Sequence, residues 1–251
     1  MRVVCLIQAR RANTRLPNKV LAKIGTKTML AHVVERCQAI EQRFPVHVIT
    51  PRHDRDLHPL TIAPEDCPET DVLKRHLLAA LELNADAVMR ITSDCPFVDP
   101  DAARDVLEVF RAGRYDYVAN DVVPTYPEGL GVEIVTVEAL KYADEQLSSG
   151  HKEDPDRTHV TPYIKRRVRS FSLGDKLKIF DGRNIRCPSY GLGNIKLSVD
   201  TEYDLKLARA IWDTNMLPVD IIRPMVHTLV AYRKVMDDND WARDGKAQVA
   251  H

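Results

Sequence analysis

The stretch RVVCLIQARRANTRLPNKVL, residues 2–21, decides what fold and what kind of site to expect. After Arg2, its next five residues are apolar and rich in β-branched side chains, as is typical of a short strand buried on both faces of a parallel sheet. Four cations then follow within ten residues, namely Arg10, Arg11, Arg15 and Lys19. Because like charges repel at this spacing, the loop predicts an anionic ligand among them, the alternative being solvated surface charges.

The overall charge indicates that such an anion site is local. The 251 residues contain 36 Lys and Arg against 36 Asp and Glu, so no net field attracts nucleic acid or an anionic membrane, and neither is expected as a partner. With 44% hydrophobic residues, the chain is long enough for one large α/β domain. We predict that domain over residues 1–235 and a C-terminal tail over 236–251, with two smaller domains as the weaker alternative.

Two features of the sequence bear on where the protein works. The opening MRVVCLI is too short for the apolar core of a secretion signal, and no run reaches the ~20 apolar residues of a membrane helix. The five cysteines, at positions 5, 37, 67, 95 and 187, form no CxxC pair, which argues against a disulfide framework or a zinc site. We therefore expect a cytoplasmic protein.

Hydrophobic periodicity predicts alternating strands and helices in the first half of the chain. Strands are expected at 2–7, 46–50 and 87–92, and helices at about 28–41, 72–83 and from Pro100 to Gly113. Asp71 is suited to cap the second helix, and the polar, proline-rich residues 51–70 predict a long exposed loop. The alternation predicts a doubly wound, mostly parallel sheet, which binds ligands beyond the carboxyl ends of its strands.

The second half of the chain is less regular. Strands are expected at 115–120, 132–137, 169–173 and 196–199, one of them antiparallel, and helices at about 137–147, 156–166, from Asp200 and at 219–235. The sequence contains neither GxGxxG after the first strand nor GxxxxGK[ST] anywhere. These absences argue against a dinucleotide-dependent dehydrogenase and against a P-loop enzyme.

The chemistry of the cationic loop and of two aspartates points to a polyphosphate. Arg can donate to two phosphate oxygens at once, and Lys acts as a compact charge. Asp94 and Asp200 each come directly after an expected strand, so their carboxylates would point into the same crevice. Since Mg²⁺ prefers one or two carboxylates plus phosphate oxygens, the pair predicts a magnesium site. The alternatives are a helix cap for Asp200 and a turn for Asp94.

Five segments in succession resemble the CMP-sugar synthetase superfamily, the cytidylyltransferases for Kdo and acylneuraminates, and most closely its spore-coat-polysaccharide branch. They lie between residues 3 and about 212 and read IQARRANTRLPNKVL, RITSDCPFVDP, YPEGLGVEIVTVEAL, RTHVTPYI and LSVDTEYDLKLARAI. The resemblance implies a Rossmann-like (GT-A-like) nucleotidyltransferase fold with three layers and a mixed, mostly parallel sheet. It also implies a Mg²⁺-dependent, homodimeric enzyme that joins CTP to a sugar acid or phosphorylated acceptor and releases pyrophosphate, in surface glycan synthesis.

The resemblance implies roles for single residues as well. Arg10, Arg15 and Lys19 would contact the triphosphate, Gln8 and Ala9 would lie along the nucleotide, and Asp94 and Asp200 would hold Mg²⁺. Lys19, Arg15, Asp94 and Asp200 form the expected catalytic set. From position in the chain, Asp71 is a further candidate for contact with the nucleotide. Arg90 would either reach the nucleotide or pair with a core carboxylate, and Glu133, Arg157 and His159 are the acceptor-side candidates.

The chain departs from the superfamily pattern at two places. In the first loop Arg11, Ala12, Asn13 and Asn18 stand where Met, Gly, Ser and Gly are usual, although Asn18 can still adopt the left-handed conformation. In the middle of the chain Gly131 replaces an Asp that would face the acceptor. Transfer of another nucleotide, or binding of a nucleotide without catalysis, are therefore the alternative functions.

Overall fold

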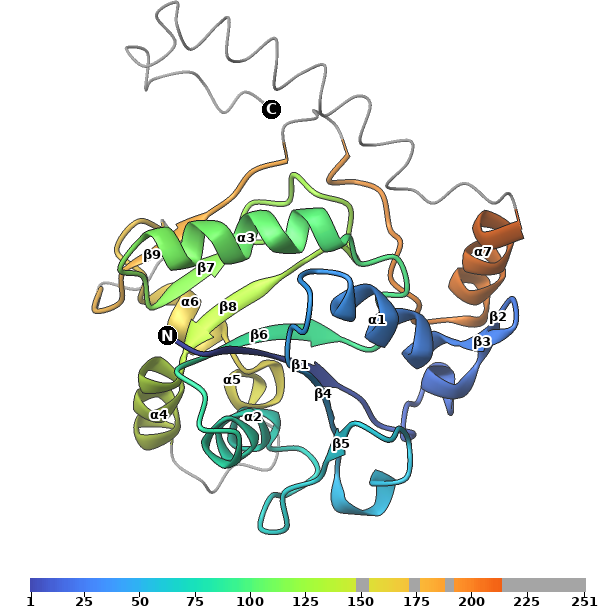
Figure 1. The fold of residues 1–251 in the computed structure, drawn as a ribbon, viewed down its shortest axis with the longest axis horizontal. Helices are drawn as coiled ribbons and strands as arrows, with labels where there is room; N and C mark the ends of the chain where they lie inside the picture. The colour runs from blue at the N-terminus through green and yellow to red at the C-terminus, as the bar shows by residue number, and fades with distance from the viewer. Residues whose placement is uncertain (148–153, 172–176, 188–191, 214–251) are drawn as a thin grey trace, which may run out of the picture.

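A seven-stranded sheet forms the centre of the molecule (Figure 1). The computed structural model describes residues 1–147, 154–171, 177–187 and 192–213. In spatial order the strands are β5 (Thr61–Ile62), β4 (Val46–Ile49), β1 (Val3–Gln8), β6 (Ala87–Thr92), β8 (Glu133–Thr136), β7 (Tyr117–Ala119) and β9 (Gly182–Asn184). Pairing is parallel except that β8 runs antiparallel to both neighbours. The predicted mixed, mostly parallel sheet is confirmed.

Helices cover both faces of this sheet, which makes the fold a three-layer α/β structure (Figure 1). One face carries α1 (Met29–Gln38) and α3 (Pro100–Ala112). The other carries α2 (Val72–Glu82), α4 (Val137–Gln146), α5 (Pro155–His159) and α6 (Pro162–Arg166). Short elements complete this part of the chain: η1 (Lys19–Leu21), η2 (Arg52–Asp54) and the hairpin of β2 (Lys23–Ile24) and β3 (Lys27–Thr28).

The alternation of side chains along β1 explains how one strand serves both layers. Cys5 and Ile7 pack with the α1 and α3 layer, whereas Val4 and Leu6 pack with the α2 and α4 layer. All four are fully buried. A central parallel strand has no face toward water, so its sequence is apolar without interruption until the chain leaves the sheet at Gln8. The loop beyond Gln8 lies outside the sheet and is therefore free to be polar and to build a site.

Four of the sequence-based expectations are wrong in detail. The 51–70 segment contains η2 and the edge strand β5, and it buries Leu57. The helix expected at 156–166 is two helices, separated where Val160 takes a positive φ of 73° just before Pro162, whose ring and missing N–H oppose a continuous helix.

The last expected strands also differ. Residues 169–171 form no strand, and β9 closes that edge of the sheet instead. Residues 196–199 contribute one isolated bridge, Lys196 to Glu128, and the helix after them, α7 (Glu202–Asp213), begins two residues beyond Asp200. The segment expected at 219–235 and the tail at 236–251 lie outside the described residues.

Candidate active site

A cavity of about 630 Å³ opens at the edge of the sheet where β1 and β6 end. The reversed strand β8 begins at this same edge, so its first residue joins the carboxyl ends of the parallel strands there. Ten of the predicted site residues line the cavity: Gln8, Ala9, Arg10, Arg15, Lys19, Arg90, Asp94, Glu133, His159 and Asp200. These ten residues, predicted from the sequence, therefore meet at one cavity, at the sheet edge where this fold class binds ligands.

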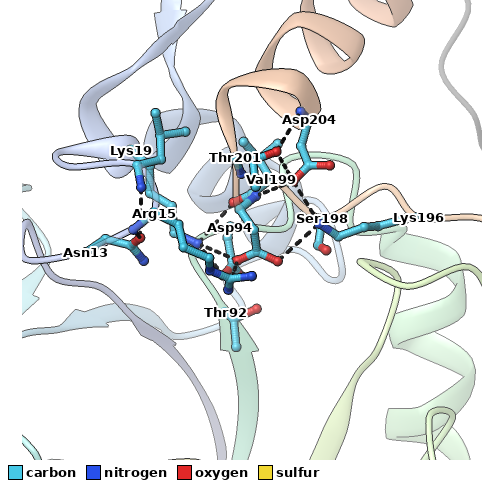
Figure 2. A network of polar contacts seen from close by, with 12 residues as sticks. Asn13, Arg15, Lys19, Thr92, Asp94, Lys196, Ser198, Val199, Thr201 and Asp204 are labelled. Carbon is cyan, nitrogen blue, oxygen red and sulfur yellow. Dashed lines mark hydrogen bonds and ion pairs between the residues drawn. The ribbon is translucent and has the colours of Figure 1, made fainter.

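Lys19 brings the two predicted metal-binding aspartates together (Figure 2). Its Nζ lies 2.8 Å from Oδ2 of Asp94 and 3.0 Å from Oδ1 of Asp200, and it also donates to the carbonyl of Val199 at 3.0 Å. Arg15 Nη2 donates to the same Asp200 oxygen at 2.9 Å. Segments some 75 to 185 residues apart in the chain thus converge on one point.

Local backbone structure explains this convergence. Asn18 adopts the left-handed conformation, with φ 57° and ψ 23°, and so starts the 3-10 turn that turns Lys19 inward. Asparagine tolerates this conformation better than most residues, so the turn survives the loss of the usual glycine, as expected. On the other side, the amide of Val199 donates to the carbonyl of Asp94 at 2.8 Å, which ties the segment before α7 to the end of β6.

Charge around Asp200 holds it in the ionised form. Burial alone would raise the pKa of Asp200, but hydrogen bonds and positive charge from Lys19 and Lys196 outweigh burial and lower it. Asp204, in the first turn of α7, accepts from the amides of Asp200 and Thr201. Burial opposes ionisation there too, yet the bond from Lys196 and these amides lower the pKa of Asp204 to about 2. The turn that carries Asp200 is therefore fixed by charge-assisted hydrogen bonds.

The pair of carboxylates fits a magnesium ion. A single positive centre, the ammonium of Lys19, already contacts oxygens of both Asp94 and Asp200, so one cation is able to contact both. Oxygen donors suit Mg²⁺, which usually takes its other ligands from phosphate and water. Within the described part of the chain, no cluster of three or more His, Cys, Asp or Glu side chains could hold a metal by itself.

The anions that balance the cationic loop are largely the protein's own carboxylates. Arg11 pairs with Asp54 at 3.0 Å and with Asp56 at 2.8 Å and does not line the cavity. Arg10 lines the cavity and lies 3.8 Å from Glu69. The inference that four clustered cations require an external anion is thus incomplete, because sequence alone could not show which distant carboxylates would return to them.

A second charged cluster lines the cavity around Glu133. Its carboxylate accepts from Arg90 Nη1 at 2.5 Å, from the hydroxyls of Tyr117 at 2.6 Å and Thr161 at 2.7 Å, and lies 2.6 Å from Nζ of Lys165. Burial would raise the pKa of Glu133, but the charges of Lys165 and Arg90 outweigh it and hold that pKa well below its usual range. Of the two alternatives for Arg90, the core pair is confirmed.

The loop between β7 and β8 contains a cavity-lining carboxylate that sequence analysis missed. Asp121 lines the cavity and pairs with Lys165 at 3.1 Å. A Cβ at Gly131 would lie 3.3 Å from the Cβ of Asp121, so a carboxylate stands beside position 131 although that position has lost its own. Asn120 joins the two ends of the loop, since its side chain donates to Leu130 O and accepts from Val132 N. Nothing in the sequence pairs residue 121 with residue 131.

Two of the predicted residues lie away from the cavity, paired with each other. Asp71 caps α2 by accepting from the amide of Lys74, and its other oxygen accepts from Arg157 at 2.7 and 2.9 Å. Arg157 also bonds to Asp144 and to the carbonyl of Leu147. Neither Asp71 nor Arg157 lines the cavity, although His159, two residues further along, does.

Comparison with known proteins agrees with the geometry. The family model for cytidylyltransferases matches residues 4–211. A 3-deoxy-manno-octulosonate cytidylyltransferase of Bartonella bacilliformis is 30% identical over 241 residues, which cover 84% of this chain and 98% of that protein. The spore coat polysaccharide biosynthesis protein SpsF of Bacillus subtilis is 24% identical over 225 residues, 84% of this chain and 86% of SpsF.

Solved structures show the same fold. A cytidylyltransferase from Leptospira borgpetersenii serovar Hardjo-bovis superposes with a TM-score of 0.74 at 22% identity and full coverage of both chains. CMP:2-keto-3-deoxy-manno-octonic acid synthetase complexed with CTP gives 0.58 at 18% identity over 86% of this chain and 100% of that one. The predicted nucleotidyltransferase fold is confirmed. Because the family model spans the cationic loop, both aspartates and most of α7, this chain is a nucleotidyltransferase that belongs to the cytidylyltransferase family.

Proposed function

We propose that this enzyme transfers the CMP group of CTP to a small anionic acceptor, a sugar acid or a phosphorylated metabolite, and releases pyrophosphate. One observation carries the proposal, namely that Lys19, Asp94 and Asp200 meet at one end of a cavity large enough for a nucleotide. Two relatives support the acceptor class by their names, one a cytidylyltransferase for 3-deoxy-manno-octulosonate and one a spore coat polysaccharide protein.

The reaction forms one bond and breaks one. An acceptor oxygen bonds to the α-phosphorus of CTP, the bond from that phosphorus to the bridging oxygen breaks, and pyrophosphate leaves with the electron pair. The protein mainly positions the reactants and neutralises charge. Asp94 and Asp200 would hold Mg²⁺, and the ion when bound neutralises negative charge on phosphate oxygens.

Arg15 and Lys19 differ in what they offer a phosphate. All three donors of the Lys19 ammonium are engaged, with Asp94, Asp200 and the Val199 carbonyl. Arg15 uses only Nη2 among the described residues, and its side chain is 61% exposed. Arg15 is therefore the better placed of the two to bind the leaving pyrophosphate, while Lys19 holds the two carboxylates at one point.

The acceptor would lie toward Glu133, Asp121 and His159, which line the cavity beyond the end of β6. Glu133 is fully bonded and ionised, so it orients Arg90 and Lys165 and does not abstract a proton. Burial and the nearby Glu133 raise the pKa of Asp121, which suits a carboxylate that accepts a proton from an acceptor hydroxyl. A phosphorylated acceptor would need no such base.

We also propose that the enzyme works in the cytoplasm, as a homodimer, in surface glycan synthesis. CTP use and the spore coat relative support this setting. Among the described residues, no helix is both long and apolar enough to cross a bilayer.

Pyrophosphate release tests the reaction. Each of the four NTPs is offered with Mg²⁺ against a panel of sugar acids, including 3-deoxy-manno-octulosonate, and of phosphorylated metabolites. Of the four NTPs, we expect only CTP to release pyrophosphate, and only when certain acceptors are present. We expect the release to stop when EDTA removes Mg²⁺. Turnover with a different NTP would show that this NTP, and not CTP, is the donor. Tight, metal-indifferent CTP binding without turnover on any acceptor would instead support a binding module.

A further inference from the structure

Arg75 is a cavity-lining cation that the proposed mechanism leaves without a role. It lies in the first turn of α2 and is 2% exposed, yet it lines the same cavity as Lys19 and Asp94. Its Nη2 donates to two backbone carbonyls, of Pro68 at 3.1 Å and of Glu69 at 2.7 Å. Those two bonds fix the orientation of the guanidinium.

The remaining donors of Arg75 have nothing to bind. Neither Nε nor Nη1 makes a hydrogen bond with any residue that the structure describes, and no described carboxylate lies within ion-pair distance. Burial lowers the pKa of Arg75, which is the expected effect of placing a cation away from water without a counter-charge. A buried unsatisfied donor costs free energy, so a ligand that bonds to it gains affinity.

The location of Arg75 points to the nucleoside half of a nucleotide. Among the described residues, Arg75 makes no hydrogen bond or ion pair with Asp94 or Asp200, the two carboxylates that contact Lys19. Arg75 comes from the α2 layer, whereas Lys19 comes from η1, beside α1 on the opposite layer. The cavity that both residues line also includes Gln8 and Ala9, at the end of β1.

The cavity wall includes apolar surface that suits a flat ring. Val72, in the same turn of α2 as Arg75, and Ala9, just after β1, both line the cavity and are otherwise buried. Apolar walls with a few placed polar groups are typical of sites that bind a heterocycle. A phosphate bound here would make no favourable contact with this apolar surface, whereas a heterocycle would.

A guanidinium distinguishes cytosine from uracil by the hydrogens at the ring edge. Cytosine offers N3 as a hydrogen-bond acceptor, so the Nη1 of Arg75 that has no partner among the described residues can donate to it. Uracil carries a hydrogen on N3, so Nη1 would face another donor there. Sites that leave a buried polar group unpaired with the wrong ligand discriminate strongly.

We propose that Arg75 is the base-recognising residue of this enzyme, donating to N3 of cytosine from Nη1, which has no partner among the described residues. This inference rests on the proposed use of CTP and deepens it, because it names the residue that selects the base. Arg75 would carry specificity, and Arg15, Lys19 and the two aspartates would carry the phosphates and the reaction.

Equilibrium binding of nucleotides tests this assignment. Titration calorimetry with Mg²⁺ compares CTP, UTP and 3-deaza-CTP, in which a C–H group replaces N3, on the wild type, Arg75→Met and Arg75→Lys. Lys74→Met is the matched control, since Lys74 is the neighbouring residue on α2 and does not line the cavity. We expect the wild type to prefer CTP over the other two, and both Arg75 variants to bind CTP roughly 10- to 100-fold more weakly, the range for a hydrogen bond to a charged group.

The ratio of affinities is the decisive quantity, because partial unfolding of a variant lowers the apparent affinity for all three nucleotides alike. Loss of the preference for CTP over UTP and over 3-deaza-CTP in Arg75→Met, with the preference kept in Lys74→Met, would support the assignment. A preference that survives in Arg75→Met would overturn the assignment and leave the proposed function intact. A wild-type protein that does not bind CTP would overturn both.

Discussion

The two charged clusters of the cavity contain similar residues and differ in how completely their carboxylates are enclosed. In the first cluster, Asp94 and Asp200 both contact Lys19, and their side chains are 26% and 15% exposed to solvent. In the second cluster, Glu133 pairs with Arg90 and Lys165 and accepts hydrogen bonds from two hydroxyls, and its side chain is 2% exposed. An enclosed carboxylate with all its bonds made stabilises the fold. A carboxylate that faces the cavity is available to a ligand.

Glu133→Gln tests the enclosed cluster and carries the largest expected effect. It leaves the buried charge of Arg90 without a counter-charge and Lys165 with Asp121 alone, so we expect the free energy of unfolding to fall by about 3–5 kcal/mol. Denaturant unfolding measures this. Glu108→Gln, on the exposed side of α3, is the control and should change stability by about 0.5 kcal/mol or less. Equal stability of the two variants would mean that the enclosed pairing is not structural.

Asp94→Asn tests the open cluster. We expect pyrophosphate release to fall by about 100-fold or more, as for loss of one charge-stabilising group, with little change in stability. Asp86→Asn is the control, because Asp86 precedes β6 where Asp94 comes after it, and its side chain is exposed. If Asp94→Asn lowered the free energy of unfolding as much as Glu133→Gln does, the open cluster would be as important for folding as the enclosed one.

Arg157→Lys tests a site prediction against the structural pairing. Lysine lacks the fork that contacts Asp71 twice, so we expect a loss of about 1–2 kcal/mol in the free energy of unfolding. The KM for the acceptor should not change, since Arg157 does not line the cavity. Arg169→Lys, in a half-exposed pair with Asp181, should cost less. A raised KM for the acceptor in Arg157→Lys alone would restore its predicted role on the acceptor side.

Acid titration gives the smallest and most specific effect. The pKa of Glu133 is lowered in the folded protein, so its contribution to stability is complete above its ordinary value of 4.5 and is lost as the pH falls below it. The free energy of unfolding of the wild type should therefore decrease with acid more steeply than that of Glu133→Gln, by at most about 1.4 kcal/mol per pH unit for one proton. Parallel pH profiles would show that Glu133 does not titrate differently on folding.

The parts of the fold that the sequence predicts are those decided by local pattern. β1, α2 and β6 are predicted by apolar periodicity, and the cap at Asp71 is predicted by side-chain chemistry. β5 and β9 are only two and three residues long, too short for a pattern, and they exist because neighbouring strands offer them hydrogen bonds. The 196–199 segment has the pattern of a strand but pairs at one residue only.

The site shows the same limit. Lys19, Asp94 and Asp200 could be proposed because each lies at the end of an expected element, and the fold brings such ends together. The role of Glu133 could not, because it depends on two cations, Arg90 and Lys165, that reach it from two other segments of the chain. Arg75 had one overlooked signal, since an arginine on the apolar face of an amphipathic helix is rarely there without a partner.

The reversal of β8 places a loop beside the cavity that is fixed at both ends. The chain leaves the cavity edge after β7 and returns to it at the start of β8, and Asn120 fastens the two ends of that excursion together. Within this loop, Glu128 accepts a hydrogen bond from Ser198, two residues before Asp200. A change within residues 121–131 would therefore reach both the wall of the cavity and the segment that carries Asp200.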